Sequence, residues 1–446
     1  MHSISPSIFG TDGIRKRVGI APLSAETLPK LGYAIASWAE KKYGSCPTII
    51  MGYDTRKSCD EIKCALQDGL LRRSITILDA GILPTPAVYL LAQNNPTIHC
   101  AIIISASHNP YYDNGIKIID AKTGKITAED ENQINLLYHQ TNDITLEHRR
   151  VTFCAQPIDE AKQLYCDSII NHFPKNLLSD KKIIIDCAHG ATYQVAPIIF
   201  KALGADLIVI NAEPNGENIN DQCGAIAPEQ LKKAVLTHKA DIGFAFDGDG
   251  DRITVVSRYG DIKDGDDIIA MLLTNPLYAT GQTVVGTIMS NHALEQMVHD
   301  KNKNFIRTTV GDKYIVQQMR ENNSLLGGEP SGHIIIRDYL DSSDGIFTAL
   351  RLAQTLQTNA NWDMHSFIHC PQVVLSIPVT TKKDLTDQGI KHIITSHEEL
   401  LKKGRIIVRY SGTENMLRIM VEDITEDHTV SLAHSLANKL GNYLSQ

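Results

Sequence analysis

Three acidic residues at alternate positions are the clearest chemical feature of the sequence. Asp247, Asp249 and Asp251 are separated by single glycines and followed by Arg252. Alternate residues of an extended loop point to one side, so three carboxylates would gather there and repel one another unless a cation joins them. Oxygen ligands alone select a hard ion, Mg²⁺ or Ca²⁺. An EF-hand is excluded, because its sixth and twelfth positions require Gly and Glu and here hold Arg252 and Arg258. A plain acidic turn is the alternative.

A serine follows a predicted buried strand in the first quarter of the chain. The apolar run 101–104 predicts that strand, and Asn109-Pro110 predicts a turn after it. Ser107 and His108 would therefore lie at the carboxyl end of a strand, where open α/β sheets bind ligands. Lys117 would follow on the same loop. The G-x-S-x-G pattern of serine hydrolases is absent, so a nucleophilic Ser107 would attack something other than an ordinary ester. An ordinary turn is the alternative.

Two further segments carry groups that suit an anion or a sugar. Arg15 ends the glycine-containing segment 9–15, from which its guanidinium could reach an anion. Glu329, Ser331 and His333 supply a carboxylate, a hydroxyl and an imidazole, which are suitable partners for sugar hydroxyls. Lys313 stands at a predicted helix start, also available to an anion. Plain turns are the alternative for both segments.

A last loop, residues 409–415, follows a predicted strand near the C-terminus. Arg409 supplies a guanidinium fork, while Ser411, Gly412 and Thr413 supply exposed N–H groups and two hydroxyls. This combination suits a dianionic phosphate. A glycine-containing hairpin turn is the alternative.

Alternating strands and helices position these loops. Such alternation predicts mostly parallel sheets, and it restarts twice, which gives a soft threefold repetition. Within the first repeat, Ser58 and Glu61 predict a capping box at the start of a helix. The predicted strands of the three repeats are residues 48–51, 75–78, 101–104, 182–186, 207–210, 242–246, 284–289 and 305–309.

The C-terminal 80 or so residues follow a different pattern. Strands are predicted at 373–377, 405–410 and 417–421, and helices at 383–403 and 426–443. The tight connection between the last two strands predicts antiparallel pairing. The predicted fold class is therefore α/β, with three similar mixed-sheet α/β domains plus a C-terminal α+β domain. The predicted limits are 1–150 with the Ser107 loop, 151–256 with the Asp247 loop, 257–368 with the Glu329 loop, and 369–446 with the Arg409 loop.

Composition excludes several classes of partner. The chain of 446 residues has 43 Lys and Arg against 51 Asp and Glu, a net charge of −8, and no basic run, so no nucleic acid partner is predicted. No apolar run approaches the roughly 20 residues of a membrane span, and no signal peptide is predicted. Nine cysteines without a C-x-x-C pair predict reduced core thiols. We expect a cytoplasmic protein without a membrane partner; whether it forms a homodimer is left open.

Taken together, the four loops resemble those of the α-D-phosphohexomutase family, in the same order over essentially the whole chain. The segment 9–15, Phe-Gly-Thr-Asp-Gly-Ile-Arg, further resembles the branch that acts on glucosamine phosphates. The resemblance implies four domains around one central cleft, a phosphoserine at Ser107 and one Mg²⁺ per active site. The implied metal ligands are Ser107, Asp247, Asp249 and Asp251.

The resemblance also implies how a phosphosugar substrate would bind and react. It implies interconversion of a sugar 6-phosphate and 1-phosphate through a bisphosphate, feeding UDP-N-acetylglucosamine and peptidoglycan synthesis. We expect Ser107, His108, Lys117 and Arg15 to be catalytic, with His108 and Lys117 as the candidates for acid–base help and Arg15, Lys117 and Arg252 neutralising charge. The expected substrate-binding residues are Arg252, Lys313, Glu329, Ser331, His333, Arg409, Ser411, Gly412 and Thr413. The chain departs from the family pattern at Lys16, Pro330 and Asn415. Phosphomannomutase or phosphoglucomutase activity, and a non-catalytic phosphosugar sensor, are the alternatives.

Overall fold

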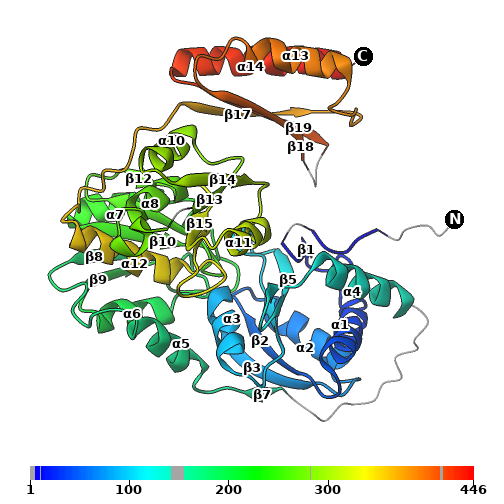
Figure 1. Ribbon diagram of the computed structural model, residues 1–446. Helices are drawn as coiled ribbons and strands as arrows, with labels where there is room; N and C mark the ends of the chain where they lie inside the picture. The colour runs from blue at the N-terminus through cyan, green and yellow to red at the C-terminus, as the bar shows by residue number, and fades with distance from the viewer. Residues whose placement is uncertain (1–5, 11, 142–154, 282, 412–414, 446) are drawn as a thin grey trace.

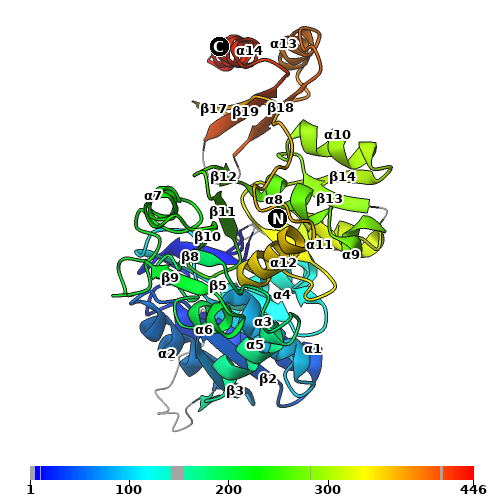
Figure 2. The same ribbon diagram turned by 90° about the vertical axis from the view of Figure 1, so that its left-hand side faces the viewer.

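Four β-sheets, each with its own helices, make up the computed structural model, which describes residues 6–10, 12–141, 155–281, 283–411 and 415–445. We number them domains I to IV in chain order. Domains I to III lie against one another, and domain IV projects from domain III (Figures 1 and 2). The predicted fold class is confirmed: three α/β domains are followed by a small α+β domain.

Domain I is built on a seven-stranded mixed sheet of order β1-β5-β4-β2-β3-β7, with β6 paired to β5. Strands β4, β2, β3 and β7 run parallel, whereas β5 is antiparallel to both β4 and β1. The strands are β1 (Ile14–Arg17), β2 (Thr48–Tyr53), β3 (Thr76–Ile82), β4 (Cys100–Ile104), β5 (Asp113–Asp120), β6 (Gly124–Lys125) and β7 (Gln156–Pro157), and the helices are α1 (Leu28–Tyr43), α2 (Cys59–Leu70), α3 (Thr85–Asn94) and α4 (Ala128–Gln140). Strand β7 lies beyond residue 150 and still pairs with β3 of this sheet. The predicted domain limit at residue 150 is therefore not established here and stays a prediction.

Two local predictions in domain I are wrong. Lys117 does not lie on a loop with Ser107; it lies in β5 and pairs with Ile103 of β4. The polar start of this segment favours a turn, but the isoleucines on either side of Lys117 extend the sheet. Ser58 precedes α2 without forming a capping box, and its backbone is already helical, with φ −77° and ψ −9°, whereas a capping residue is usually extended. Its hydroxyl accepts a hydrogen bond from Asn114 Nδ2 of β5 at 2.8 Å instead. In both places contacts with residues distant in the sequence accompany the departure from the local preference.

Domain II has a five-stranded sheet of order β12-β11-β10-β8-β9. Strands β10, β8 and β9 are parallel, and β11 is antiparallel to β10 and to β12. The strands are β8 (Lys182–Asp186), β9 (Asp206–Ile210), β10 (Ile242–Phe246), β11 (Ile253–Ser257) and β12 (Ile262–Lys263), and the helices are α5 (Ala161–Ile170), α6 (Val195–Ala202) and α7 (Glu229–His238). The Asp247 loop is thus the connection between β10 and its antiparallel neighbour.

Domain III repeats this arrangement in a four-stranded sheet of order β14-β13-β15-β16. Strand β13 is parallel to β14 and β15, and β16 is antiparallel to β15. The strands are β13 (Thr283–Thr287), β14 (Asn304–Thr308), β15 (Leu326–Gly328) and β16 (Ile334–Ile336), and the helices are α8 (Gly265–Leu272), α9 (Pro276–Ala279), α10 (His292–Asp300), α11 (Asp312–Glu321) and α12 (Gly345–Thr358). The loops of Ser107, Asp247 and Glu329 therefore occupy equivalent places: each joins a parallel strand to an antiparallel one.

Domain IV is a three-stranded antiparallel sheet of order β17-β19-β18 covered by two helices. Its elements are β17 (Gln372–Pro378), α13 (Gln388–Glu398), β18 (Arg405–Tyr410), β19 (Met416–Glu422) and α14 (Glu426–Leu444). The predicted antiparallel pairing of the last two strands is confirmed.

One apolar core runs through domains I, II and III, whereas domain IV has a core of its own. The strands that end at the site are buried along their whole length, as β4 and β10 show. Domain IV meets domain III through polar contacts, among them Arg405 Nη1 to Ile288 O at 2.6 Å and His292 N to Glu422 Oε1 at 2.8 Å. A domain with a separate core and a polar attachment can move as a unit without opening an apolar interface.

The remaining expectations concern cysteines and membranes. The described cysteines are all unpaired, and five of them are buried: Cys59, Cys100, Cys166, Cys187 and Cys223. Across the described residues, every helix is too short or too polar to cross a membrane.

Candidate active site

Ser107 stands in a tight turn directly beyond β4. Its φ is 52°, in the left-handed region that non-glycine residues seldom adopt, and its side chain is buried. The Oγ donates to Asp247 Oδ2 at 2.7 Å and lies 3.3 Å from His108 Nδ1. The serine predicted from the domain I loop thus meets the first acidic residue predicted from the domain II loop.

A buried arginine that the sequence did not single out holds this turn. Arg56 follows β2 and donates from Nη2 to the carbonyl oxygens of Ser107 and Asn109 at 2.9 and 2.8 Å, and from Nη1 to Asp113 O at 3.0 Å. Its Nε pairs with Asp54 Oδ2 at 2.9 Å, and both side chains are fully buried. A left-handed residue costs about 1–3 kcal/mol and persists only where its surroundings hold it; the guanidinium fork of Arg56 holds Ser107 in this conformation.

Two further polar groups complete the support of Ser107. Ser105 Oγ donates to Asp54 Oδ2 at 2.5 Å and accepts the Ser107 N–H at 2.9 Å. From domain II, Asn220 Nδ2 donates to Ser107 O at 2.9 Å. The hydroxyl of Ser105 is therefore occupied with structural bonds, so of these two serines it is Ser107 that presents its hydroxyl to the acidic loop.

The three acidic residues converge as their spacing predicted. One oxygen from each of Asp247, Asp249 and Asp251 lies within 4.8 Å of the others, and all three residues are buried. Among the described residues, the Oδ1 atom of Asp249 has no hydrogen-bond partner. Buried carboxylate oxygens without partners are costly, so this donor set fits a divalent cation.

Two glycines allow the acidic loop to wrap this closely. Gly250 has a φ of +72°, and a Cβ at Gly248 would lie 2.6 Å from Ser107 O. The first requires the left-handed region and the second leaves no room for a side chain. The alternation of Asp and Gly is therefore needed to bring the carboxylates to the serine.

Lys117 reaches the acidic loop from β5. Its ammonium lies 2.8 Å from Asp249 Oδ2 and 2.9 Å from Asp251 Oδ2, and 3.4 Å from Asp12 Oδ2. Although burial opposes its charge, these three carboxylates hold the pKa of Lys117 well above its ordinary value. The lysine is thus a fixed positive charge beside the carboxylates.

The three carboxylates differ in their electrostatic surroundings. Burial raises the pKa of Asp247 to about 8, and the charges of Asp251 and Asp249 act in the same direction. Burial also opposes ionisation of Asp251, but His333 and Lys117 outweigh it and hold the pKa of Asp251 well below its usual range. Asp247, which also receives the Ser107 hydroxyl, is therefore the carboxylate that most needs an added cation.

A second group of possible metal ligands is satisfied internally. Asp264, Asp267 and His369 also bring ligand atoms within 4.8 Å of one another. However, Asp264 and Asp267 form the reciprocal capping box of α8, and His369 lies 3.2 Å from Asp267 Oδ2. The Asp247 group is the stronger candidate for a metal site.

The domain III loop joins the acidic loop through a histidine. His333 Nε2 lies 3.1 Å from Asp251 Oδ1, and its Nδ1 lies 3.6 Å from Glu329 Oε2. Burial disfavours the imidazolium, but Asp251 and Glu329 prevail and raise the pKa of His333 to about 10. Ser331 Oγ lies 3.3 Å from Glu329 Oε2, so the predicted trio of this loop is gathered in one place.

The remaining predicted cations surround the same centre. Arg15 lies in β1 and pairs with Asp12 Oδ2 at 2.5 Å, and the backbone N–H of Arg252 donates to Asp247 Oδ1 at 3.0 Å. Burial, together with Arg252 and Arg15, lowers the pKa of His108 to about 4. Lys313 lies at the start of α11, in the wall of two adjoining pockets of domains I and III.

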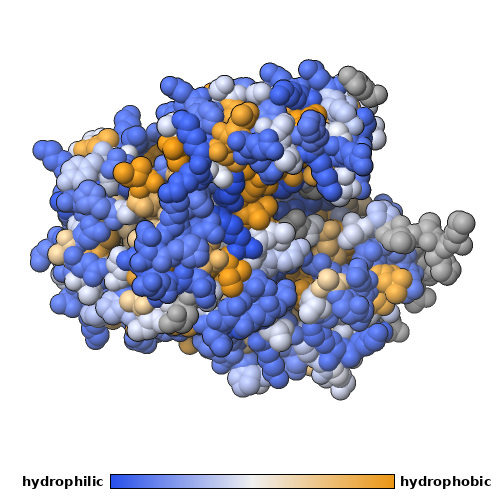
Figure 3. All heavy atoms as spheres, turned by 45° about the horizontal axis from the view of Figure 1, so that its top comes forward, coloured by the Kyte–Doolittle hydropathy of each residue, from blue (hydrophilic) through white to orange (hydrophobic). Residues whose placement is uncertain are grey.

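The domain IV loop ends β18 on the far side of a hollow. Figure 3 shows this hollow on the right-hand side, between domain IV above and domain I below. Arg409 has no ion pair within the described part of the chain, and it faces Arg418 directly in the β18–β19 register. Opposed cations across two strands are unfavourable, and burial together with Arg418 lowers the pKa of Arg409. Arg409 therefore suits an anion; Arg418 is a residue that sequence reasoning missed. Ser411 is buried, while Gly412 and Thr413 lie outside the described residues.

The structure thus brings together the predicted residues of domains I, II and III, but not those of domain IV. The residues missed by sequence reasoning are Asp54, Arg56, Asn220 and Arg418. Of these residues, only Arg418 could have been noticed from the sequence. It is a charged residue between apolar ones in a predicted strand, and the predicted hairpin of the last two strands places it near Arg409. Partners such as Arg56 and Asn220 come from other strands and could not be found from spacing.

The fold and this serine–carboxylate centre match one class of enzyme along the chain. The Phosphoglucomutase/phosphomannomutase models match in four parts: alpha/beta/alpha domain I at residues 6–144, domain II at 163–260, domain III at 264–372 and the C-terminal domain at 376–439. The chain belongs to this family of phosphohexomutases, which are isomerases.

Within the family, similar curated relatives carry one name. The chain is 41% identical to a phosphoglucosamine mutase of Campylobacter curvus (strain 525.92), covering 93% of this chain and 94% of the relative. It is 38% identical to one of Acinetobacter baumannii, covering 97% and 98%.

Solved structures share the fold at lower identity. A phosphoglucomutase/phosphomannomutase family protein of Burkholderia thailandensis superposes with a TM-score of 0.80 at 22% identity, covering 99% of this chain and 98% of that one. An Aspergillus fumigatus N-acetylphosphoglucosamine mutase, solved in complex with GlcNAc-6P and magnesium, gives a TM-score of 0.67 at 17% identity, with 98% and 96% covered. At such identities the likeness establishes the fold.

Proposed function

We propose that the protein is a phosphoglucosamine mutase, which interconverts glucosamine 6-phosphate and glucosamine 1-phosphate through a phosphorylated Ser107. The observation that supports this most is the 2.7 Å hydrogen bond between Ser107 Oγ and Asp247, within a cluster of three buried carboxylates. The amino-sugar substrate follows from the phosphoglucosamine mutases that share about two fifths of the sequence. The product would serve UDP-N-acetylglucosamine synthesis and peptidoglycan precursors.

The proposed reaction moves a phosphoryl group twice. In the first step the P–O bond to Ser107 Oγ breaks and a new P–O bond forms to the free sugar hydroxyl, whose proton passes to a nearby base. The sugar bisphosphate then turns over; the P–O bond between its other phosphoryl group and the sugar breaks as a P–O bond to Ser107 Oγ forms, and the proton passes from the base to the sugar oxygen that is released. His108, whose Nδ1 lies 3.3 Å from Oγ, is the candidate base. Lys117 and Arg15 remain charged and stabilise the transition state.

Ser107, Asp247, Asp249 and Asp251 would hold one Mg²⁺. The ion would supply positive charge to the phosphate oxygens in the loose transition state. The Oδ1 atom of Asp249, which has no hydrogen-bond partner among the described residues, and the all-oxygen donor set fit a hard cation.

The other loops would bind the substrate. Glu329, Ser331 and His333 would contact the sugar hydroxyls, and Arg252 and Lys313 would add positive charge at the cleft. The phosphate that does not react would be held in domain IV by Arg409, Ser411, Gly412 and Thr413. We keep 1–150, 151–256, 257–368 and 369–446 as the proposed domain limits.

Phosphomannomutase or phosphoglucomutase activity is the second candidate. Pro330 favours it, since the glucosamine enzymes usually carry Gln at this place in the sugar loop. A direct assay with the 1-phosphates of glucosamine, mannose and glucose separates the candidates. We expect the highest kcat/KM with glucosamine 1-phosphate.

Ser107→Ala tests the mechanism. We expect no turnover and little loss of stability, and no rescue by Ser105, whose hydroxyl is bonded to Asp54 and to the Ser107 N–H. Peptide mapping of active wild-type protein should find one phosphate, on Ser107. An active Ser107→Ala variant, or phosphate on Ser105 alone, would exclude the proposed mechanism.

A further inference from the structure

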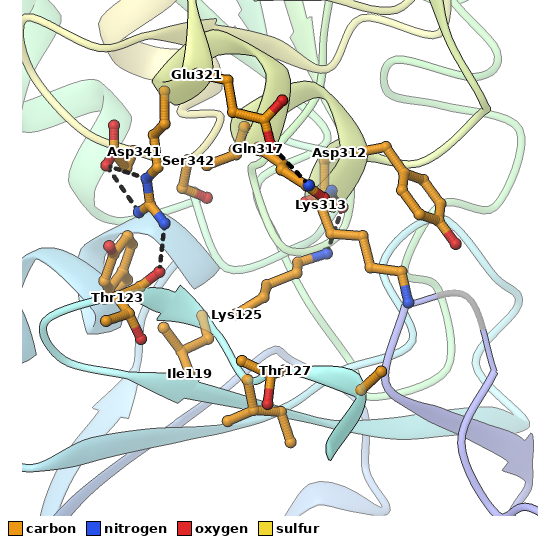
Figure 4. A pocket seen from close by; sticks show the side chains of 16 residues that line it. Ile119, Thr123, Lys125, Thr127, Asp312, Lys313, Gln317, Glu321, Asp341 and Ser342 are labelled. Atoms are coloured by element: carbon orange, nitrogen blue, oxygen red, sulfur yellow. Dashed lines mark hydrogen bonds and ion pairs between the residues drawn. The ribbon is translucent and has the colours of Figure 1, made fainter. Parts of the chain in front are cut away.

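A polar bridge crosses the seam between domains I and III away from the reacting atoms. Lys125 of β6 pairs with Asp312 at the first position of α11, with Nζ 2.5 Å from Oδ1, and also with Asp12. Asp12 is held in turn by Arg15 and Lys117. Figure 4 shows Lys125 reaching up from domain I to Asp312 on the α11 side.

The seam beside this bridge is open. A pocket of about 550 Å³ separates the β5–β6 edge and the start of α4 from α11. Beyond it, a second polar contact joins the domains, from Arg320 Nη1 to Thr123 O at 2.8 Å. Since a pocket of this size lies between the two contacts, packing does not fix α11 against domain I here. The position of the start of α11 relative to domain I therefore depends on polar contacts, of which the Lys125–Asp312 bridge is the one at this end of the helix.

The start of α11 is also tied to the sugar loop. The backbone N–H of Gly311, the N-cap of α11, donates to Glu329 Oε1 at 2.9 Å. Glu329 faces His333, and His333 faces Asp251 of the acidic loop. Asp251 pairs with Lys117. The contacts close a ring that leads from the acidic loop through the sugar loop to α11, and back through the Lys125 bridge.

We propose that Lys125 and Asp312 are positioning residues that hold the sugar loop in register with the phosphoryl-transfer centre. This inference rests on the proposed function. Neither side chain contacts Ser107 or the three carboxylates; they act through Asp12 on one side and through α11 and Gly311 on the other. In-line transfer requires the reacting atoms to approach to about 3–3.5 Å, and a displacement of about 1 Å can cost about a hundredfold in rate. A ring of contacts that spans three domains can keep the sugar loop and the Ser107 centre within that distance of each other.

The test compares Lys125→Met, Lys125→Arg, Asp312→Asn and the double variant Lys125→Met/Asp312→Asn. Lys122→Met is the matched control, since Lys122 lies on the exposed turn before β6 and its side chain forms no ion pair among the described residues. We expect Lys125→Met to lower kcat about 10- to 100-fold while KM changes less than about threefold, because domain IV would still hold the substrate phosphate. Lys125→Arg should recover most of kcat, and the double variant should be no worse than the worse single variant.

Hydrogen exchange of the unliganded protein gives a readout that does not depend on turnover. Lys125→Met should speed exchange in residues 311–313 and 327–333, and Lys122→Met should leave both segments unchanged. If Lys125→Met exchanges and turns over as the wild type does, the positioning role is refuted while the proposed function stands. If kcat falls only in proportion to a loss of folded protein, or the two substitutions act additively, it is likewise refuted. Absence of mutase activity in the wild type would refute the proposed function, and the exchange measurement would still decide whether the bridge holds the sugar loop.

Discussion

Arg56→Lys should lower both the stability of the Ser107 turn and kcat, although Arg56 contacts neither the Ser107 hydroxyl nor the three carboxylates of the acidic loop. The guanidinium makes five side-chain hydrogen bonds, to Asp54 and to four backbone carbonyls of the Ser107 turn. A lysine has three donors at a single point and no planar fork, so at least two of these five acceptors lose their bond from residue 56. Ser107 O and Asp54 Oδ2 keep bonds from Asn220 and Ser105, and the bonds to Asn109, Pro110 and Asp113 are only partly buried. Since a hydrogen bond contributes about 0.5–1.5 kcal/mol net, we expect a loss of about 1–3 kcal/mol in the free energy of unfolding.

The same change should lower turnover in the protein that remains folded. Ser107 at a φ of 52° stores about 1–3 kcal/mol of strain, and release of the turn allows the backbone to relax away from this conformation. A bias of about 2 kcal/mol corresponds to about a thirtyfold smaller population of the aligned serine. We expect kcat to fall about 10- to 100-fold, with Mg²⁺ affinity within about threefold of the wild type, because the three carboxylates are unchanged.

Denaturant unfolding, steady-state kinetics and Mg²⁺ titration together check this prediction. Arg258→Lys is the matched control, since Arg258 makes one partly exposed pair with Asp241 at 2.6 Å and should cost less than about 1 kcal/mol. The reasoning is refuted if Arg56→Lys keeps kcat within about threefold of the control, or if Mg²⁺ affinity falls together with kcat.

Three further predictions concern the metal, the phosphate and pH. Asp249→Asn should weaken Mg²⁺ binding at least about tenfold and remove most activity with a normal unfolding midpoint; unchanged Mg²⁺ affinity by titration would exclude Asp249 as a ligand. Arg409→Ala should raise KM about ten- to a hundredfold through the loss of a charge-assisted bond of about 1.5–3 kcal/mol; a normal KM would show a structural role only. Burial raises the pKa of Asp344 to about 6, above its unfolded value of about 3.9, so the folded state binds the extra proton and stability falls as pH rises through this window. Between about pH 5 and pH 7.5 the wild type should lose about 1.4 kcal/mol relative to Asp344→Asn, and parallel pH profiles of the two proteins would contradict the shift.

Local sequence was sufficient to single out Ser107 and the three aspartates of the proposed site. The alternation of aspartates and glycines in residues 247–251 predicts a convergent acidic loop because single-residue spacing sets which side chains share a side. The apolar run before Ser107 predicts a buried strand, and Asn109-Pro110 predicts the turn that ends it. The strands 182–186, 242–246 and 405–410 agree with β8, β10 and β18 to the residue, since each is a short run of β-branched or aromatic residues with polar limits.

Contacts between strands decided what local patterns could not. Lys117 looked like a loop residue, but pairing with β4 places it in β5, from which it reaches two carboxylates of another domain. Ser58 had the sequence of a helix cap, but its hydroxyl accepts a hydrogen bond from Asn114 Nδ2 instead. Arg56 is 51 residues from the carbonyl that it binds at Ser107, and no periodicity connects them.

The arrangement of the domains decided the rest. Asp12, Lys125 and Asp312 are ordinary surface-type residues in the sequence, and they form one bridge only because α11 of domain III lies opposite β6 of domain I. His333 links Asp251 and Glu329 only because the Glu329 loop of domain III lies against the acidic loop of domain II. Short-range spacing determines which groups share a loop, whereas the buried charges of this site are balanced by partners from other sheets, which only the folded chain brings within reach of one another.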